Sequence, residues 1–252
     1  MESTQSLFEY LLRIGDNALI LGQRLSEWCG HGPVLEQDIA ITNIALDHIG
    51  QARSILAYAG GCEGQGHNED QIAYLRDAWD FRNILLVELP NQDWAFTIIR
   101  QFLFDSWNYY FHQDLLHSTD KQISAIAEKS LKEIAYHLRF SAEWVIRLGD
   151  GTDVSHEKMQ IALDDLWTYS GEMQIPDALD LEMRDLGIGA DLEKIKPLVD
   201  QKRKDIFREA TLQIPADEWM QQGGKQGRHT EHLGFILADM QFMQRAYPNM
   251  HW

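Results

Sequence analysis

The fold class follows from residues 7–28, LFEYLLRIGDNALILGQRLSEW. Apolar side chains recur here at alternating spacings of four and three residues, at Leu7, Leu11, Ile14, Ala18, Leu21, Leu25 and Trp28. This spacing is typical of the contact face of a helix in a bundle. A second apolar row, Phe8, Leu12 and Leu19, makes the helix apolar on more than one side, so we expect it to be central and buried. The pattern from Ser6 to Glu9 is that of a capping box and predicts that the helix begins there.

The rest of the chain also shows helical patterns. Its six prolines fall between the periodic segments, as expected where proline interrupts helices. Helices are predicted at about 36–59, stopped by Gly60 and Gly61; at 69–88; from a cap at Asn91 or Asp93 to 117; from a cap at 118–120 to 148; at 155–173, 177–186 and 191–211; and up to Tyr247. No segment has a convincing strand pattern. The sequence predicts an all-α bundle forming a single domain over residues 1–252, with its core at about 6–148 and extra helices at 152–252.

The charge balance excludes several classes of function. There are 22 Lys and Arg against 39 Asp and Glu, a net charge of −17, which disfavours binding to nucleic acid or to an anionic membrane surface. The first residues lack the features of a signal peptide, and no apolar run is long enough for a membrane helix. Two cysteines, of which Cys29 is expected to be buried, fit a reducing compartment. We therefore expect a cytoplasmic protein.

Four acids lie within apolar rows on four different predicted helices: Asp16, Asp47, Asp105 and Glu133. A di-iron carboxylate site in a helical bundle takes a Glu from each of two helices and a Glu-x-x-His pair from each of two others. The histidines miss this register, because Gly50 follows Asp47 by three residues and Tyr136 follows Glu133 by three. His137 is one residue further on, at i+4, about 40° round the helix from Glu133, and His48 is about 100° from Asp47.

Two interpretations of these acids remain open. One is a di-iron centre that uses Asp16, Asp47, Asp105, Glu133 and His137. The other, which the sequence favours, is a buried polar network without metal that also includes Gln51 and Tyr136. Similarly, Asp105 and His112 share a helix face as an acid–base pair or, in the favoured interpretation, as hydrogen-bonded core residues.

Five stretches of the chain resemble the C subunits of ring-1,2-phenylacetyl-CoA epoxidase, the PaaC family. They are RIGDNALILGQRLSEWCGH (13–31), IALDHIGQARSILAYAG (44–60), LLVELPNQDWAFTIIRQFLFDSWNYYF (85–111), KEIAYHLRFSAEWVIRLGDGTDVSHEKMQ (132–160) and GGKQGRHTEHLGFILADMQF (223–242). The resemblance implies a ferritin-like helical fold and a structural role in a multicomponent oxygenase of phenylacetate breakdown. It also implies a partner A subunit that carries the di-iron centre and binds the acyl-CoA, and a reductase subunit that supplies electrons.

The loop before the last predicted helix, GGKQGRHT, carries two cations on an acidic chain, Lys225 and Arg228. It lacks the order of residues and the preceding strand that a phosphate-binding P-loop needs. Lys225 and Arg228 are candidates for contact with a partner subunit or with the phosphates of CoA, while solvated loop charge is the default interpretation. His229 or Thr230 is expected to cap the last helix, with the glycines forming a tight turn.

Three hypotheses follow. The favoured one is a non-catalytic subunit that supports the catalytic A subunit, with no metal and no cofactor in this chain and iron in the partner. The first alternative is a di-iron oxidase or oxygenase in its own right. The second is a self-associating helical protein, such as a homodimer, without an oxygenase partner.

Overall fold

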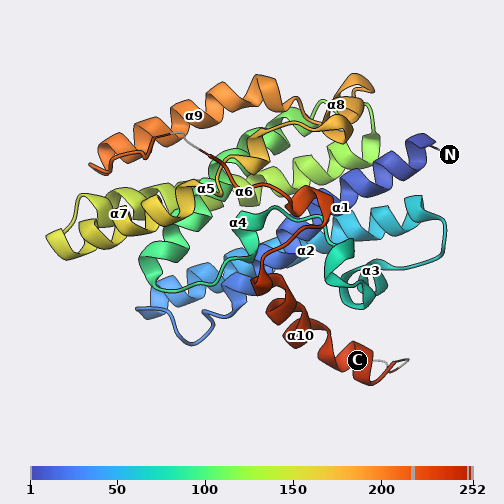
Figure 1. Ribbon diagram of the computed structural model, residues 1–252, viewed down its shortest axis with the longest axis horizontal. Helices are drawn as coiled ribbons and strands as arrows, with labels where there is room; N and C mark the ends of the chain where they lie inside the picture. Colours follow the sequence, from blue (N-terminus) through green and yellow to red (C-terminus); the bar gives the residue numbers. More distant parts are fainter. Residues whose placement is uncertain (1, 217–218, 249, 251–252) are drawn as a thin grey trace. The chain divides into compact units, whose positions relative to one another are not determined.

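A computed structural model describes residues 2–216, 219–248 and 250 (Figure 1). All regular secondary structure in these ranges is α-helix or short 3-10 helix, which confirms the predicted all-α fold class. None of the helices described combines the length and the apolar character of a membrane span. The chain divides into two compact units, one made of the residues up to Pro90 and from Gly223 onward, the other of Asn91–Gln222.

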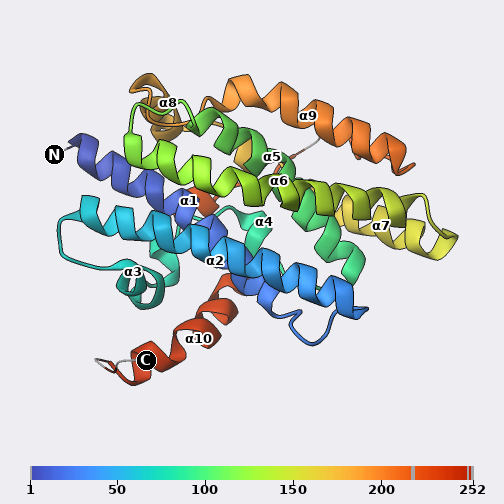
Figure 2. The same cartoon turned by 180° about the vertical axis from the view of Figure 1, so that it is seen from behind.

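The first unit is built on two long helices that lie side by side, α1 (Glu2–Ser26) and α2 (Leu35–Glu63) (Figures 1 and 2). Glycines of α1 allow the close approach. A Cβ atom on Gly15 would stand 2.6 Å from Leu56 Cδ2, and one on Gly22 would stand 2.9 Å from Ile49 Cδ1. The apolar rows of α1 are buried almost throughout, as predicted. The predicted start at Ser6 is wrong, because α1 is already helical from Glu2.

The end of α2 also differs from the prediction. The helix continues through Gly60 and Gly61 to Glu63 and stops at Gly64, whose φ of 76° is the left-handed conformation typical of a helix C-terminus. Gly60 serves packing instead of termination. A Cβ atom there would lie 2.2 Å from the backbone oxygen of His67, where the chain returns past the helix.

The predicted helix at 69–88 is wrong and is replaced by three short segments: α3 (Glu69–Leu75), the 3-10 helix η1 (Ala78–Asp80) and α4 (Leu85–Glu88). Arg76 is extended, and the Asp77 and Asp80 side chains bond reciprocally with each other's backbone. These bonds give the backbone an alternative to helix. The unit is completed by η3 (Gly224–Gln226) and α10 (Glu231–Ala246), which is capped by Thr230 and packs on α3 with further contacts to α1, α4 and η1.

The second unit begins with a hairpin of two long helices, α5 (Trp94–Leu115) and α6 (Lys121–Gly149). It continues with α7 (Asp153–Trp167), η2 (Glu172–Gln174), α8 (Ala178–Asp185) and α9 (Leu192–Glu209). The expectation that all six prolines fall between helices is wrong for Pro197, which lies inside α9. Side-chain caps confirm the predicted starts of four of these helices, at Asp93, Asp120, Asp177 and Asp191. Arg203 of α9 is buried and donates to the Leu103 carbonyl at 2.6 Å, which ties α9 to α5.

Candidate functional site

The acid on the first helix, Asp16, is fully buried and held by an arginine. Both Asp16 oxygens accept hydrogen bonds from the Arg76 guanidinium, one of them from Nη1 at 3.0 Å. The backbone N–H of Arg82 donates to Asp16 Oδ2 at 2.8 Å. Arg76 also lies over the Phe81 ring, 4.2 Å from its centroid. This bidentate pairing neutralises the Asp16 carboxylate. A carboxylate that binds a metal ion would instead direct its charge to that ion.

The second helix buries His48 more deeply than Asp47, the acid that the sequence pattern placed in an apolar row. Asp47 is half-buried, whereas the neighbouring His48 and the later Gln51 are buried. An imidazole and an amide, and not the Asp47 carboxylate, are therefore the buried polar groups on this turn of α2.

On α5, Asp105 is fully buried and bonded to two neutral donors. Gln101 Nε2 donates to its Oδ1 at 2.8 Å, and the Ser141 hydroxyl of α6 donates to its Oδ2 at 2.7 Å. Burial raises the pKa of Asp105 to about 6, against the lowering effects of His137 and of the two hydrogen bonds. Asp105 is therefore a core acid within its unit, beside an imidazole that is buried as well.

The other predicted residues of α6 lie nearer the surface. Glu133 is half-buried, and Tyr136 is 39% exposed, beside Phe140 and under the Arg139 guanidinium. Placing Tyr136 in a buried network was wrong, because its position on α6 turns the ring outward. The buried polar residue that α6 places one turn after His137 is instead Ser141.

The sequence pattern did not predict the partners of Asp16 and Asp105. Ser141 follows His137 by one helical turn, and that spacing could have identified it. Arg76 is 60 residues from Asp16 and has no local signal. The fit to a di-iron centre is poor at Asp16, because a guanidinium already occupies its carboxylate, so no step of a reaction is assigned to metal in this chain.

A second buried polar cluster of the first unit, around Glu88, was also not predicted. The fully buried carboxylate of Glu88 accepts from Asn83 Nδ2 at 3.0 Å and from the Thr230 backbone N–H at 2.6 Å. It also lies 2.9 Å from Nδ1 of His229. The other ring nitrogen, Nε2, is 3.0 Å from the Phe81 carbonyl oxygen. Because both ring nitrogens face acceptors, the arrangement suits the doubly protonated imidazolium.

Electrostatics agree with this protonation state. Burial lowers the pKa of His229, but the hydrogen bond and charge of Glu88, aided by the Phe81 carbonyl, outweigh burial and raise it. A buried ion pair thus fastens the loop that precedes α10. Thr230 caps that helix as predicted, accepting from the His232 N–H at 3.2 Å.

The two cations of this loop differ in exposure. Lys225 is buried, with 8% of its surface exposed, and so lacks the access that contact with an external phosphate needs. Arg228 is exposed and stays a candidate contact residue. Gly224 packs tightly, since a Cβ atom there would lie 2.1 Å from the Asn83 carbonyl oxygen.

Two further predictions concern single residues. Cys29 is exposed, so its predicted burial is wrong: it lies in the turns that follow α1, beyond the buried face. His112 is buried, with Nδ1 3.0 Å from the Asn108 carbonyl oxygen, and burial lowers its pKa to about 4. It is therefore neutral at physiological pH and bonded within its own helix.

Fold and site together define an all-α protein with buried, internally bonded acids, the first of them neutralised by arginine. The chain belongs to the family of phenylacetic acid catabolic proteins, whose model matches residues 1–252. It is 46% identical over 246 residues to the C subunit of the 1,2-phenylacetyl-CoA epoxidase of Escherichia coli strain K12, a match that covers 98% of this chain and 99% of that protein. The predicted family, with its ferritin-like helical fold, is confirmed.

Proposed function

We propose that this chain is a structural, non-catalytic subunit of a multicomponent oxygenase that epoxidises the ring of phenylacetyl-CoA. One observation carries the proposal: the similarity to the Escherichia coli epoxidase protein extends over nearly the whole of both chains. In this proposal the chain binds and supports a related A-type subunit, which holds the di-iron centre and the acyl-CoA. Other subunits of the complex, including a reductase, supply the electrons, and the complex works in the cytoplasm.

The environment of the acids supports a role without metal. Iron bound between helices needs carboxylates free to bridge and neutralise the ions. Asp16 is already bonded to Arg76, and Asp47 and Glu133 are only half-buried. We therefore assign no metal and no cofactor to this chain. A polar network that closes the helical core is the role we assign to its buried acids.

Co-expression with an A-type subunit tests this proposal. The chain should co-purify with a tagged A-type subunit as a complex of defined mass, and epoxidation with reductase present should need both chains. Turnover by this chain plus reductase alone would favour the di-iron enzyme hypothesis. A stable homo-oligomer that ignores the A-type subunit would favour the self-associating scaffold.

An Asp105→Asn variant sharpens the test within the complex. If Asp105 serves only the core, the variant should assemble and support turnover at the wild-type rate, because the amide retains hydrogen-bonding capacity toward Gln101 and Ser141. A variant that assembles normally but supports no turnover would contradict the non-catalytic assignment.

A further inference from the structure

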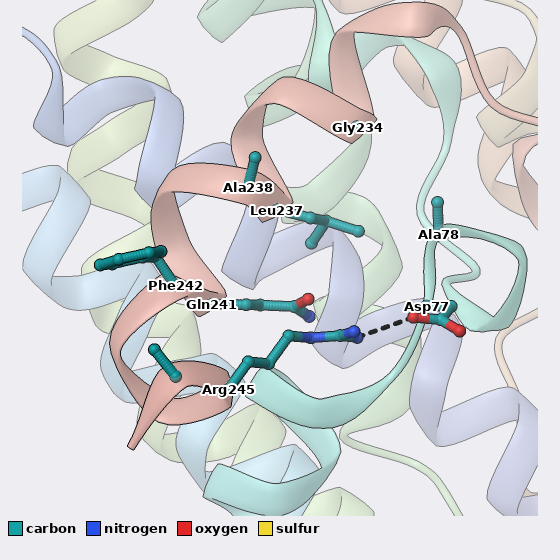
Figure 3. A pocket seen from close by; sticks show the side chains of 9 residues that line it. Asp77, Ala78, Gly234, Leu237, Ala238, Gln241, Phe242 and Arg245 are labelled. Atoms are coloured by element: carbon teal, nitrogen blue, oxygen red, sulfur yellow. Dashed lines mark hydrogen bonds and ion pairs between the residues drawn. The ribbon is translucent and has the colours of Figure 1, made fainter. Parts of the chain in front are cut away.

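The first unit has an open groove along its last helix. The groove encloses about 550 Å³ between α10 and the turn at Asp77 and Ala78. Leu237, Gln241 and Arg245 extend from α10 toward that turn (Figure 3). Gln241 is anchored by donating to the backbone oxygens of the α3 end, at 3.0 Å in the case of Arg76. These hydrogen bonds, with one from Arg245 to the same Arg76 carbonyl oxygen at 2.8 Å, fix α10 against the end of α3.

Large apolar side chains of α10 and η1, the two elements that border the groove, face solvent. On α10, Phe235 is 66% exposed and Phe242 is 61% exposed, seven residues apart on one face. Trp79, which follows the groove-lining Ala78 in η1, is 75% exposed. Aromatic side chains contribute much of the binding energy of protein interfaces, and exposed apolar patches mark such sites.

The groove face of α10 carries three small residues, and Gly234 among them is not required by internal packing. Gly234 lines the groove, and a Cβ atom there would meet no heavy atom within 4 Å. Ala238 and Ala246 line the same groove. Small residues at these positions leave room in the groove for another backbone to approach.

Charge distinguishes the possible occupants. Among the described residues that line the groove, Arg245 is the one cation, and its guanidinium is paired with Asp77 at 2.8 Å. Glu231 and Asp239 of α10 and the nearby Asp80 are exposed acids. A second copy of this chain, with its net charge of −17, would bring like charge to this surface. A segment with an apolar face flanked by Lys and Arg complements it.

We propose that the groove of α10 receives an amphipathic helix of the catalytic partner subunit, with an apolar side chain against Phe242 and basic side chains facing Asp239 and Glu231. This inference rests on the proposed function. Such helix-in-groove recognition uses anchors spaced by helical turns. The groove and the Phe235–Phe242 spacing provide that surface on α10.

The test is affinity for the A-type subunit, measured by biolayer interferometry with Phe242→Ser and Asp239→Lys variants of the full chain. Phe242→Ser should weaken binding by about tenfold or more, as expected for a central aromatic anchor. Asp239→Lys should slow association several-fold at low salt, with the difference shrinking as salt is added. Matched controls are Ile161→Ser and Glu157→Lys, which alter exposed side chains of α7. They should bind within about twofold of wild type.

The outcomes separate this inference from the proposed function. If the wild-type complex forms and both groove variants bind like wild type, the groove inference is wrong and the proposed function stands. If wild type forms no complex, both are wrong. If Phe242→Ser instead dissociates a wild-type homodimer, the occupant is a second copy and the inference is overturned. Circular dichroism melts should match wild type, because the substituted side chains are exposed.

Discussion

The ion pair between Glu88 and His229 gives the most specific prediction about stability. Replacing Glu88 with Ala removes the acceptor for three donors, from Asn83, His229 and the Thr230 backbone. It leaves a buried imidazole and a buried N–H without their partner. Removing one member of a buried ion pair costs about 3–5 kcal/mol. We expect the free energy of opening the α10 segment to fall by that amount.

Removing the other member of the ion pair should lower the opening free energy of the α10 segment by less. In His229→Ala, the Glu88 carboxylate keeps its bonds from Asn83 and Thr230, so the expected loss is about 1.5–3 kcal/mol, the value of a hydrogen bond to a charged group. In the double variant the two losses should not add, because the pair is removed only once. The double-mutant cycle should give a coupling energy of about 1–3 kcal/mol.

The coupling energy should depend on pH in a defined direction. The pKa of His229 is raised in the folded protein, so the stabilisation is fully present below the ordinary pKa of 6.5. It is lost as the pH rises through the folded-state pKa and the imidazolium loses its proton. A coupling energy measured at about pH 6 should therefore exceed that at about pH 9.

Hydrogen exchange of the α10 amides, followed by mass spectrometry, measures this local opening. Amides of α5 serve as an internal control, since they belong to the other unit and should exchange as in wild type. The reasoning is refuted if Glu88→Ala lowers the opening free energy by less than about 1 kcal/mol. A coupling energy that rises with pH would refute the assigned protonation state.

Three further substitutions follow from single environments. Arg76→Leu leaves the Asp16 carboxylate buried without its countercharge and should lower the free energy of unfolding in urea by about 3–5 kcal/mol; a loss under about 1 kcal/mol would contradict the pairing. Asp105→Asn should stabilise the protein by up to about 3 kcal/mol at neutral pH and should have no effect below about pH 4. The reason is that the raised pKa of Asp105, about 6, makes its ionised form unfavourable in the folded protein, so the wild type becomes less stable as the pH rises from the unfolded-state pKa toward 6. Equal effects at both pH values would contradict this. Gly224→Ala would place Cβ 2.1 Å from the Asn83 carbonyl oxygen and should lower the melting temperature by several degrees. An unchanged melting temperature would show that the loop shifts to accommodate the methyl group.

Several helix starts were predicted correctly where the sequence contains a strong local signal. Asp93, Asp120, Asp177 and Asp191 each cap a helix at its predicted start, because a cap and its helix are neighbours in the chain. The failure at 69–88 has a non-local cause in addition to the local bonds between Asp77 and Asp80. Arg76, where that helix breaks, is bound to Asp16, 60 residues earlier.

The candidate site could be predicted only in part for the same reason. The sequence identified Asp16 and Asp105 as acids on apolar helix faces, and both are fully buried. On α2, in contrast, Asp47 is only half-buried and His48, one residue later, is the buried side chain. The partners that decide the chemistry are distant in sequence: Glu88 and His229 are 141 residues apart. No spacing rule reaches across such a separation, so the neutralising partners appear only in the structure.

The iron content of this chain, purified alone from cells grown with added iron, tests the central claim most directly. A structural subunit should hold far less than one iron per chain, and Asp47→Ala plus Glu133→Ala should leave that value unchanged. The catalytic A-type subunit, prepared in parallel, should carry iron and serve as the positive control. Near-stoichiometric iron in this chain, lost in the double variant, would contradict the structural assignment.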